Sequence, residues 1–168
     1  MKVFLIAATT ADGKIGLAKD HHADWTSKED KQLFVKLTKE SGVMIMGMNT
    51  FKTIGRGLPG RKTIVYSYDS KVIEGVEGDV EVTSDEPEKL LQELSDQGHK
   101  SVAICGGAQI YSLFLSKGLV DELYLTVEPV LFGDGISLAE GVSLTNLQLI
   151  ETRQLNENTV LLHYSVKR

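Results

Sequence analysis

The chain has 168 residues, of which 42% are hydrophobic, and a formal net charge of −5 at pH 7. This size permits one globular domain with a sizeable core, and no Ser/Pro-rich linker divides it. The acidic net charge argues against a nucleic-acid partner. No apolar run reaches the roughly 18 residues that a membrane span needs. The single cysteine, Cys105, excludes an internal disulfide and fits a reducing, cytoplasmic compartment.

The N-terminal apolar run, Val3–Ala8, superficially suggests a secretory signal. It is too short for one, and the polar pair Asp12-Gly13 interrupts it at once. We therefore predict that the chain begins with a β-strand.

Strands and helices alternate through most of the sequence. The strand patterns are Val3–Ala8, Val43–Met46, Thr63–Ser67, Val80–Thr83, Ser101–Cys105, Glu122–Val130, Leu147–Arg153 and Thr159–Val166. The helical patterns are Ser27–Glu40, Thr50–Ile54, Pro87–Gln97 and Ala108–Ser116. The early crossovers are long enough for parallel connections, whereas the short polar loop Gln154–Asn158 is typical of an antiparallel hairpin. The sequence predicts a single α/β domain over residues 1–168, with a mixed, mostly parallel sheet of about eight strands, an antiparallel C-terminal edge and helices on both faces.

An acidic residue early in the first predicted helix has two interpretations. Ser27 can be the N-cap, and Asp30 can complete a capping box by accepting a hydrogen bond from the N–H of Ser27. Alternatively, Asp30 lies at helical spacing with Leu33, Phe34 and Leu37, on the face that should turn inward. A carboxylate there needs a partner, such as a ligand edge that can donate two parallel hydrogen bonds. The two interpretations are compatible.

A glycine-rich segment separates the second and third predicted strands. It contains Gly47, Gly55, Gly57, Pro59 and Gly60. Within it, Asn49 or Thr50 can cap a short helix that ends at Ile54. Such a unit points backbone N–H groups and a Thr hydroxyl past the C-terminal end of the first strand, where open α/β sheets bind nucleotides.

A second glycine pair, Gly106-Gly107, lies between an apolar strand and a helix. Backbone can approach a pyrophosphate closely at such a helix N-terminus. The pair alone is a weak signal, because the motif Gly-x-Gly-x-x-Gly is absent and a simple turn would explain two glycines.

Other chemistries find no support in the sequence. The four histidines, His21, His22, His99 and His163, do not have metal-ligand spacings with Cys or carboxylates, so no metal site is predicted. No Gly-x-Ser-x-Gly motif indicates a nucleophilic serine.

Together these segments resemble dihydrofolate reductase. That family carries a Gly-x-x-Thr-x-x-x-Ile-Gly-x-x-Leu-Pro-Gly-Arg block, which Gly47–Arg61 matches. The other matching parts are Ile6–Gly16, the spacing of Trp25, Asp30 and Phe34, the segment Gly106–Tyr111, the strand Asp121–Thr126 and the turn Phe132–Asp134. The resemblance covers the chain nearly from end to end, although His21–Asp24 departs from the Leu-Pro or Met-Pro pair that the family often has before its Trp.

One relative of that family competes for the same features. The reductase domain of riboflavin synthesis shares the fold and the order of the blocks, and Trp25-Thr26-Ser27 and Gly133-Asp134-Gly135 resemble it. The Leu58–Arg61 block favours folate, and the absence of zinc-binding deaminase motifs also disfavours the riboflavin alternative. A non-catalytic nucleotide-binding module is a third class, disfavoured by the retained acid.

The resemblance implies an enzyme that reduces 7,8-dihydrofolate to tetrahydrofolate by hydride transfer from NADPH. Its implied catalytic residues are Asp30, Trp25 and Thr126. Asp30 would anchor the pterin and promote protonation of N5, and Thr126 would help to hold the pterin amino group. Arg61 would pair with the glutamate α-carboxylate.

The resemblance also implies the binding residues. The substrate set is Ile6, Ala8, Phe34, Ile54, Leu58, Arg61, Cys105 and Tyr111. The cofactor set is Ala8, Ile15, Gly16, Gly47, Met48, Asn49, Thr50, Tyr66, Ser67, Tyr68, Gly106, Gly107, Ala108, Gln109 and Ile110. In the family, a cis peptide joins the two glycines that Gly106 and Gly107 match.

The sequence departs from the family at the expected cofactor phosphate. Family members commonly grip the 2′-phosphate of NADPH with basic residues, but the matching positions here are Met48 and Gln109, which are uncharged. We therefore expect NADPH to be used and NADH to be tolerated. The expected partner is a small-molecule substrate, with no nucleic acid and no membrane, in a monomer or homodimer.

Overall fold

The computed structural model describes all residues from Met1 to Arg168. Its main strands are β1 (Lys2–Thr10), β3 (Val43–Gly47), β4 (Lys62–Tyr66), β5 (Val80–Thr83), β6 (Ser101–Ile104), β7 (Glu122–Glu128), β9 (Leu147–Gln154) and β10 (Val160–Val166). Two short strands are β2 (Lys14–Gly16) and β8 (Ile136–Ser137). The helices are α1 (Lys28–Ser41), α2 (Met48–Ile54), α3 (Pro87–Asp96) and α4 (Ala108–Ser116), with a 3₁₀ turn at Ser70–Ile73.

The eight main strands form one sheet in the order β5-β4-β3-β6-β1-β7-β10-β9. From β5 to β7 every neighbouring pair is parallel, because the connections cross over the sheet. Strand β10 runs antiparallel to β7, and β9 runs antiparallel to β10. The predicted fold class, with its antiparallel C-terminal edge, is confirmed.

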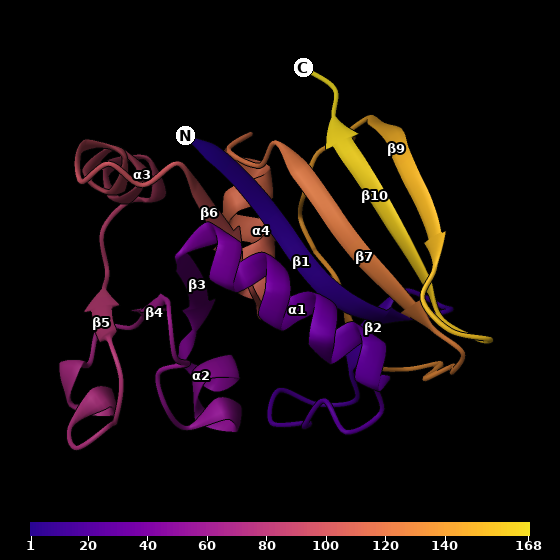
Figure 1. Cartoon of the computed structure of the whole chain (residues 1–168), viewed down its shortest axis with the longest axis horizontal. Helices are drawn as coiled ribbons and strands as arrows, with labels where there is room; N and C mark the ends of the chain where they lie inside the picture. The colour runs from indigo at the N-terminus through magenta and orange to yellow at the C-terminus, as the bar shows by residue number, and fades with distance from the viewer.

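Helices cover both faces of the sheet, as Figure 1 shows for α1 in front and α4 behind. On one face, Leu94 of α3 and Phe114 of α4 belong to a core cluster with Leu5, Ile45 and Ile104. On the other face, α1 and α2 pack against a second cluster, which contains the alternate residues of the same strands. This alternation is the expected result of burying a parallel sheet on both sides.

The structure differs from the sequence prediction mainly at short elements and at element ends. Strands β2 and β8, which pair with each other, and the 3₁₀ turn were not predicted, because two to four residues carry no readable periodicity. The expectation that Asn49 or Thr50 caps the short helix is wrong. Helix α2 begins one residue after Gly47, which is its N-cap and makes no side-chain cap bond. No helix has the length and apolar character required to cross a membrane.

Candidate active site

Asp30 lies in the first turn of α1, on the face that packs against the sheet. It is 9% exposed, Leu33 is buried, and Phe34 and Leu37 pack against the core cluster below. The backbone N–H of Asp30 donates to the Ser27 hydroxyl at 3.2 Å, which makes Ser27 the N-cap as predicted. The helical spacing therefore places a carboxylate among apolar side chains.

The second half of the predicted capping box is not formed. The N–H and hydroxyl of Ser27 both donate to Oε1 of Glu128, each at 2.8 Å. Glu128 is at the end of β7 and reaches the helix start from beneath. The expectation that the Asp30 carboxylate accepts the Ser27 N–H is therefore wrong, because a second acid takes that donor.

The pKa of Asp30 is raised above the usual Asp value, chiefly because burial disfavours the charged carboxylate. Hydrogen bonding to the hydroxyls of Thr126 and Thr26 acts in the opposite direction. Thr126 is 1% exposed and lies in register with Ala8 of β1, so strand pairing places its hydroxyl beside the acid. The site thus holds a carboxyl group that can bind or release a proton closer to neutral pH than an exposed Asp can.

Apolar side chains surround this carboxyl. Ile6 and Cys105 belong to the core cluster beneath α1, against which Phe34, Ile54 and Leu58 also pack. The hydroxyl of Tyr111, which is buried at the start of α4, donates to the carbonyl of Ile6 at 2.7 Å. Burial raises the pKa of both Cys105 and Tyr111, so both are neutral at pH 7.

Arg61 is 7% exposed and is held at the start of β4. One terminal nitrogen donates to the Thr38 hydroxyl of α1, and Nε donates to the carbonyl of Pro59 at 3.2 Å. Burial lowers the pKa of this guanidinium, and no carboxylate of the chain lies within ion-pair distance of it. The structure therefore fixes a charged group between α1 and the loop after α2 without neutralising it.

Trp25 and the loop that precedes it lie at the opposite end of α1 from Arg61. The Trp25 ring packs edge-on against Phe132 at 5.1 Å, and the His21 ring lies 5.6 Å from the same Phe132. Ile15 and Gly16 lie in β2, which pairs with β8 just beyond Phe132. The segment His21–Asp24, which departs from the family pattern, is thus packed onto the turn after β7.

The glycines of the two helix-leading turns lie side by side. The N–H of Gly47 donates to the carbonyl of Gly106 at 2.7 Å, and a cis peptide joins Gly106 to Gly107. A side chain could not be added easily, because a Cβ on Gly47 would lie 3.1 Å from Ile110, and one on Gly107 would lie 3.3 Å from the Thr50 hydroxyl. Helices α2 and α4 begin here without side-chain caps, so their first N–H groups are free.

Most of the remaining predicted cofactor residues form the rim of this area. Met48 and Asn49 begin α2, while Ala108 and the exposed Gln109 begin α4. Ser67 exchanges hydrogen bonds with the backbone of Asp69 at 3.0 and 3.2 Å, and Tyr68 is 99% exposed. The Tyr66 ring packs edge-on against Phe114 in the core, so its side chain points away from the rim.

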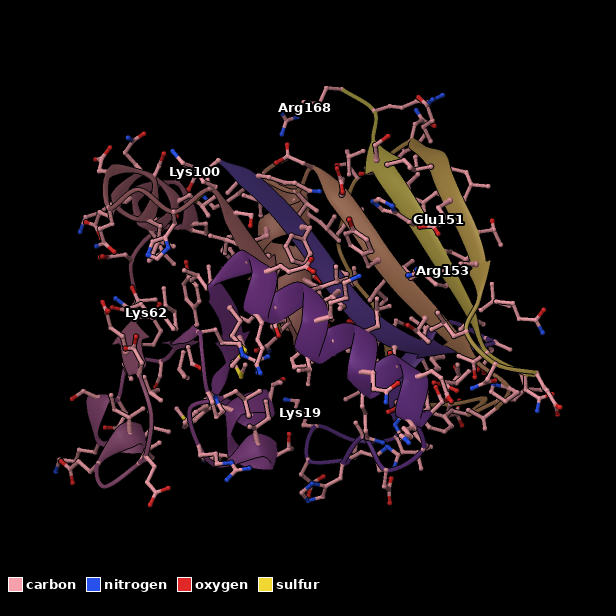
Figure 2. All side chains as sticks on the ribbon, in the orientation of Figure 1. Lys19, Lys62, Lys100, Glu151, Arg153 and Arg168 are labelled. Carbon is pink, nitrogen blue, oxygen red and sulfur yellow. The ribbon has the colours of Figure 1, made fainter.

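Lys62 does not supply charge at this rim. Lys62, labelled in Figure 2, begins β4 at the far end of the strand from Tyr66 and pairs with Glu81 at 2.5 Å. Four steps along a strand span roughly 13 Å, which separates it from the glycine turns. Lys19, also labelled, lies in the loop after β2. No group of three or more His, Cys, Asp or Glu side chains could hold a metal ion.

Several residues of the site were not singled out from the sequence. They are Thr26, Thr38, Glu128 and Thr159, all of them buried, and the half-buried Phe132. The spacing of two between Thr126 and Glu128 could have placed Glu128 on the face of β7 below α1. Thr38 and Thr159 gave no signal, because their partners are distant in the sequence.

Comparison with known proteins agrees with this geometry. The family model described as dihydrofolate reductase matches residues 2–158. The chain is also 36% identical to the dihydrofolate reductase type 3 of Salmonella typhimurium over 136 residues, which cover 80% of this chain and 76% of that relative. The chain belongs to the dihydrofolate reductase family.

Solved structures show the same fold. A putative riboflavin biosynthesis protein from Shewanella sp. PV-4 superposes with a TM-score of 0.87 at 24% identity, and each chain covers 100% of the other. A pyrimidine reductase-like protein from Corynebacterium diphtheriae superposes with a TM-score of 0.80 at 21% identity, covering 99% of this chain and 92% of that one. The fold is thus shared with proteins whose names refer to riboflavin biosynthesis and to pyrimidine reduction.

Proposed function

We propose that this member of the dihydrofolate reductase family reduces 7,8-dihydrofolate to tetrahydrofolate with NADPH. The observation that carries the proposal is Asp30, a buried carboxyl with a raised pKa and no cationic side chain paired to it. A buried acid without a protein cation is costly unless a ligand compensates it. An amidine-like pterin edge is a ligand of that kind.

The arrangement around Asp30 fits a flat, partly polar ring. The carboxyl would accept hydrogen bonds from the 2-amino group and N3–H of the pterin, and the Thr126 hydroxyl beside it would hold the same amino group. Ile6, Phe34 and the uncharged Cys105 would enclose the apolar parts of the ring. The raised pKa of Asp30 would favour protonation of N5, directly or through water.

The glycine turns fit a dinucleotide. Gly47, Gly106 and Gly107 let backbone approach a pyrophosphate, and the uncapped starts of α2 and α4 aim N–H groups at it. A reduced nicotinamide, when bound, supplies the hydride for C6 of the pterin. Ala8, Ile15 and Gly16 would hold the ring in position and exclude water from the reacting atoms.

Arg61 and the loop after α2 fit the tail of a folate. Ile54 and Leu58 would contact the aminobenzoyl ring. The Arg61 guanidinium, already oriented by Thr38, would form a bidentate pair with the glutamate α-carboxylate.

A second candidate function is reduction of a phosphorylated ribosylaminopyrimidine. The structural likeness to the Shewanella and Corynebacterium proteins favours it, as do the segments Trp25–Ser27 and Gly133–Gly135. Both candidates require the same cofactor site, so they differ only in the substrate that would bind between Asp30 and Arg61.

One assay separates the candidates. NADPH oxidation, followed at 340 nm in the presence of each substrate, is expected with dihydrofolate and not with the ribosylaminopyrimidine. Turnover of only the pyrimidine would replace the proposed function by the second one. Cofactor binding without turnover of either substrate would contradict both.

A further inference from the structure

A second buried carboxylate lies beneath the first turn of α1. Glu128, at the end of β7, is 2% exposed, and its hydrogen bonds come from neutral donors. Oε1 accepts from the N–H and the hydroxyl of Ser27, each at 2.8 Å, and Oε2 accepts from the Thr159 hydroxyl at 2.9 Å. Burying a carboxylate is costly unless hydrogen bonds compensate for the lost solvation, and here three donors do so.

Glu128 joins three elements that are far apart in the sequence. Ser27 precedes α1, Glu128 ends β7 and Thr159 precedes β10. The loop before Thr159 adds a second link to the same turn of α1, because Nδ2 of Asn156 donates to Oε2 of Glu29 at 2.9 Å. The first turn of α1 is therefore positioned by bonds from the sheet and from the last hairpin.

The Ser27 N–H is the donor that a capping box would assign to Asp30. If Asp30 accepted it, the carboxylate would turn back along the helix start. In the structure Glu128 accepts this donor, while the backbone N–H of Asp30 still uses the Ser27 hydroxyl. The helix start is satisfied without the Asp30 carboxylate.

We propose that Glu128 is a positioning residue, which takes the place of Asp30 in the capping box of α1 and so leaves the Asp30 carboxyl free to bind ligand. The inference rests on the proposed function only in naming the Asp30 carboxyl as the ligand-binding group.

Glu128 also acts on Asp30 through its charge. The groups that face Asp30 are Glu128 from β7, Lys31 on α1 and the neutral Tyr111 from α4, together with two threonine hydroxyls. The charge of Glu128 raises the pKa of Asp30 in addition to burial, and Lys31, whose Nζ donates to the Thr26 carbonyl at 2.9 Å, lowers it. Removing the charge of Glu128 should therefore lower the pKa of Asp30.

The test uses NMR on the full chain without substrate, in wild type and in Glu128→Gln, Glu29→Gln and Asp30→Asn. Glutamine keeps an oxygen for Ser27 and can donate to the Thr159 hydroxyl, so Glu128→Gln changes charge more than packing. Glu29→Gln removes the charge of a half-buried acid in the same turn, keeps an oxygen that can accept from Asn156, and is the matched control. The readouts are the ¹³C titration of the Asp30 carboxyl and the amide proton shift of Ser27.

We expect the Asp30 midpoint to fall in Glu128→Gln and to remain unchanged in Glu29→Gln. The Ser27 amide proton should move upfield in Glu128→Gln, because a neutral acceptor is weaker, and should keep its shift in Asp30→Asn. Equal Asp30 midpoints in both Gln variants, or a Ser27 amide that responds to Asp30→Asn, would overturn the inference. Should Glu128→Gln fail to fold, the Ser27 amide proton shift in Asp30→Asn still tests whether Asp30 accepts the Ser27 N–H.

These measurements need no turnover. A missing reaction with dihydrofolate would contradict the proposed function and leave the role of Glu128 intact. An active dihydrofolate reductase with an Asp30 midpoint insensitive to Glu128→Gln would contradict this inference alone.

Discussion

At the scale of single residues, the proposed reduction would require Asp30 to promote protonation of its ligand. Asp30→Asn keeps the size of the side chain but cannot supply a proton, so turnover of dihydrofolate at pH 7 should fall by about 100- to 10,000-fold. Steady-state kinetics with a parallel melting curve measures this. Retained activity with a lower melting temperature would mean that Asp30 serves only the helix start.

The same substitution has a pH-dependent effect on stability. Because the pKa of Asp30 in the folded protein is above its ordinary value, folding favours the protonated form. The contribution of Asp30 to the stability of the wild type therefore decreases as the pH rises from the ordinary Asp pKa through the higher folded value. Across that window, the free energy of unfolding of Asp30→Asn should rise relative to that of the wild type, as measured by urea denaturation at several pH values. A difference that does not vary with pH would show that the folded pKa is not raised.

Arg61 provides a second residue-scale prediction. Arg61→Leu should raise KM for dihydrofolate by about 10- to 150-fold, the equivalent of roughly 1.5–3 kcal/mol for a hydrogen bond to a charged group. A pteridine without the glutamyl tail should be little affected. Arg56→Leu, at an exposed arginine of the same loop, is the control and should leave both constants near wild type. Equal losses on both substrates would make Arg61 structural.

At the scale of elements, cofactor choice depends on the starts of α2 and α4. Met48 and Gln109 bring no charge there, and the Ser67 hydroxyl is occupied by its own turn. We expect a preference for NADPH over NADH below about a thousandfold in kcat/KM, and a greater preference in Met48→Arg. Met48→Leu controls for packing. A larger preference in the wild type would reveal a basic residue at the phosphate that the described contacts do not include.

The long elements could be predicted from the sequence, and the short ones could not. The strand pattern Val3–Ala8 lies within β1, and the helical spacing from Asp30 to Leu37 identified the buried face of α1. Strands β2 and β8 depend on pairing with each other, which local periodicity does not reveal. The short helix was predicted to begin late, because its cap is the backbone of Gly47 and not a side chain.

The same distinction holds within the site. Asp30 could be found because its neighbours on one helix reveal which way it faces. Glu128 could not, because its donors, Ser27 and Thr159, are brought to it by the sheet order and not by the sequence. Local spacing misled in one respect, since it assigned the Ser27 N–H to the nearest acid.

At the scale of the whole molecule, the antiparallel edge of the sheet is linked to the start of α1 through Glu128. Thr159 is 1% exposed, and Thr159→Val removes its hydrogen bond to a buried carboxylate with little change in volume. The free energy of unfolding should fall by about 1.5–3 kcal/mol, measured by denaturant titration. Thr145→Val is the control, because that exposed hydroxyl bonds only to the nearby carbonyl of Ser143. Equal effects of the two substitutions would mean that Glu128 does not need its third donor.

The hydrogen bond from Thr159 to Glu128 also implies an order in which parts of the site form during synthesis. A growing chain emerges from its N-terminus, so Trp25, Asp30, Arg61 and Thr126 are all synthesised before Thr159. The parallel part of the sheet can form earlier, but Glu128 gains its hydrogen bond from Thr159 only when the last hairpin pairs with β7. A nascent chain would thus carry every proposed ligand-binding group before Glu128 has received its hydrogen bond from Thr159.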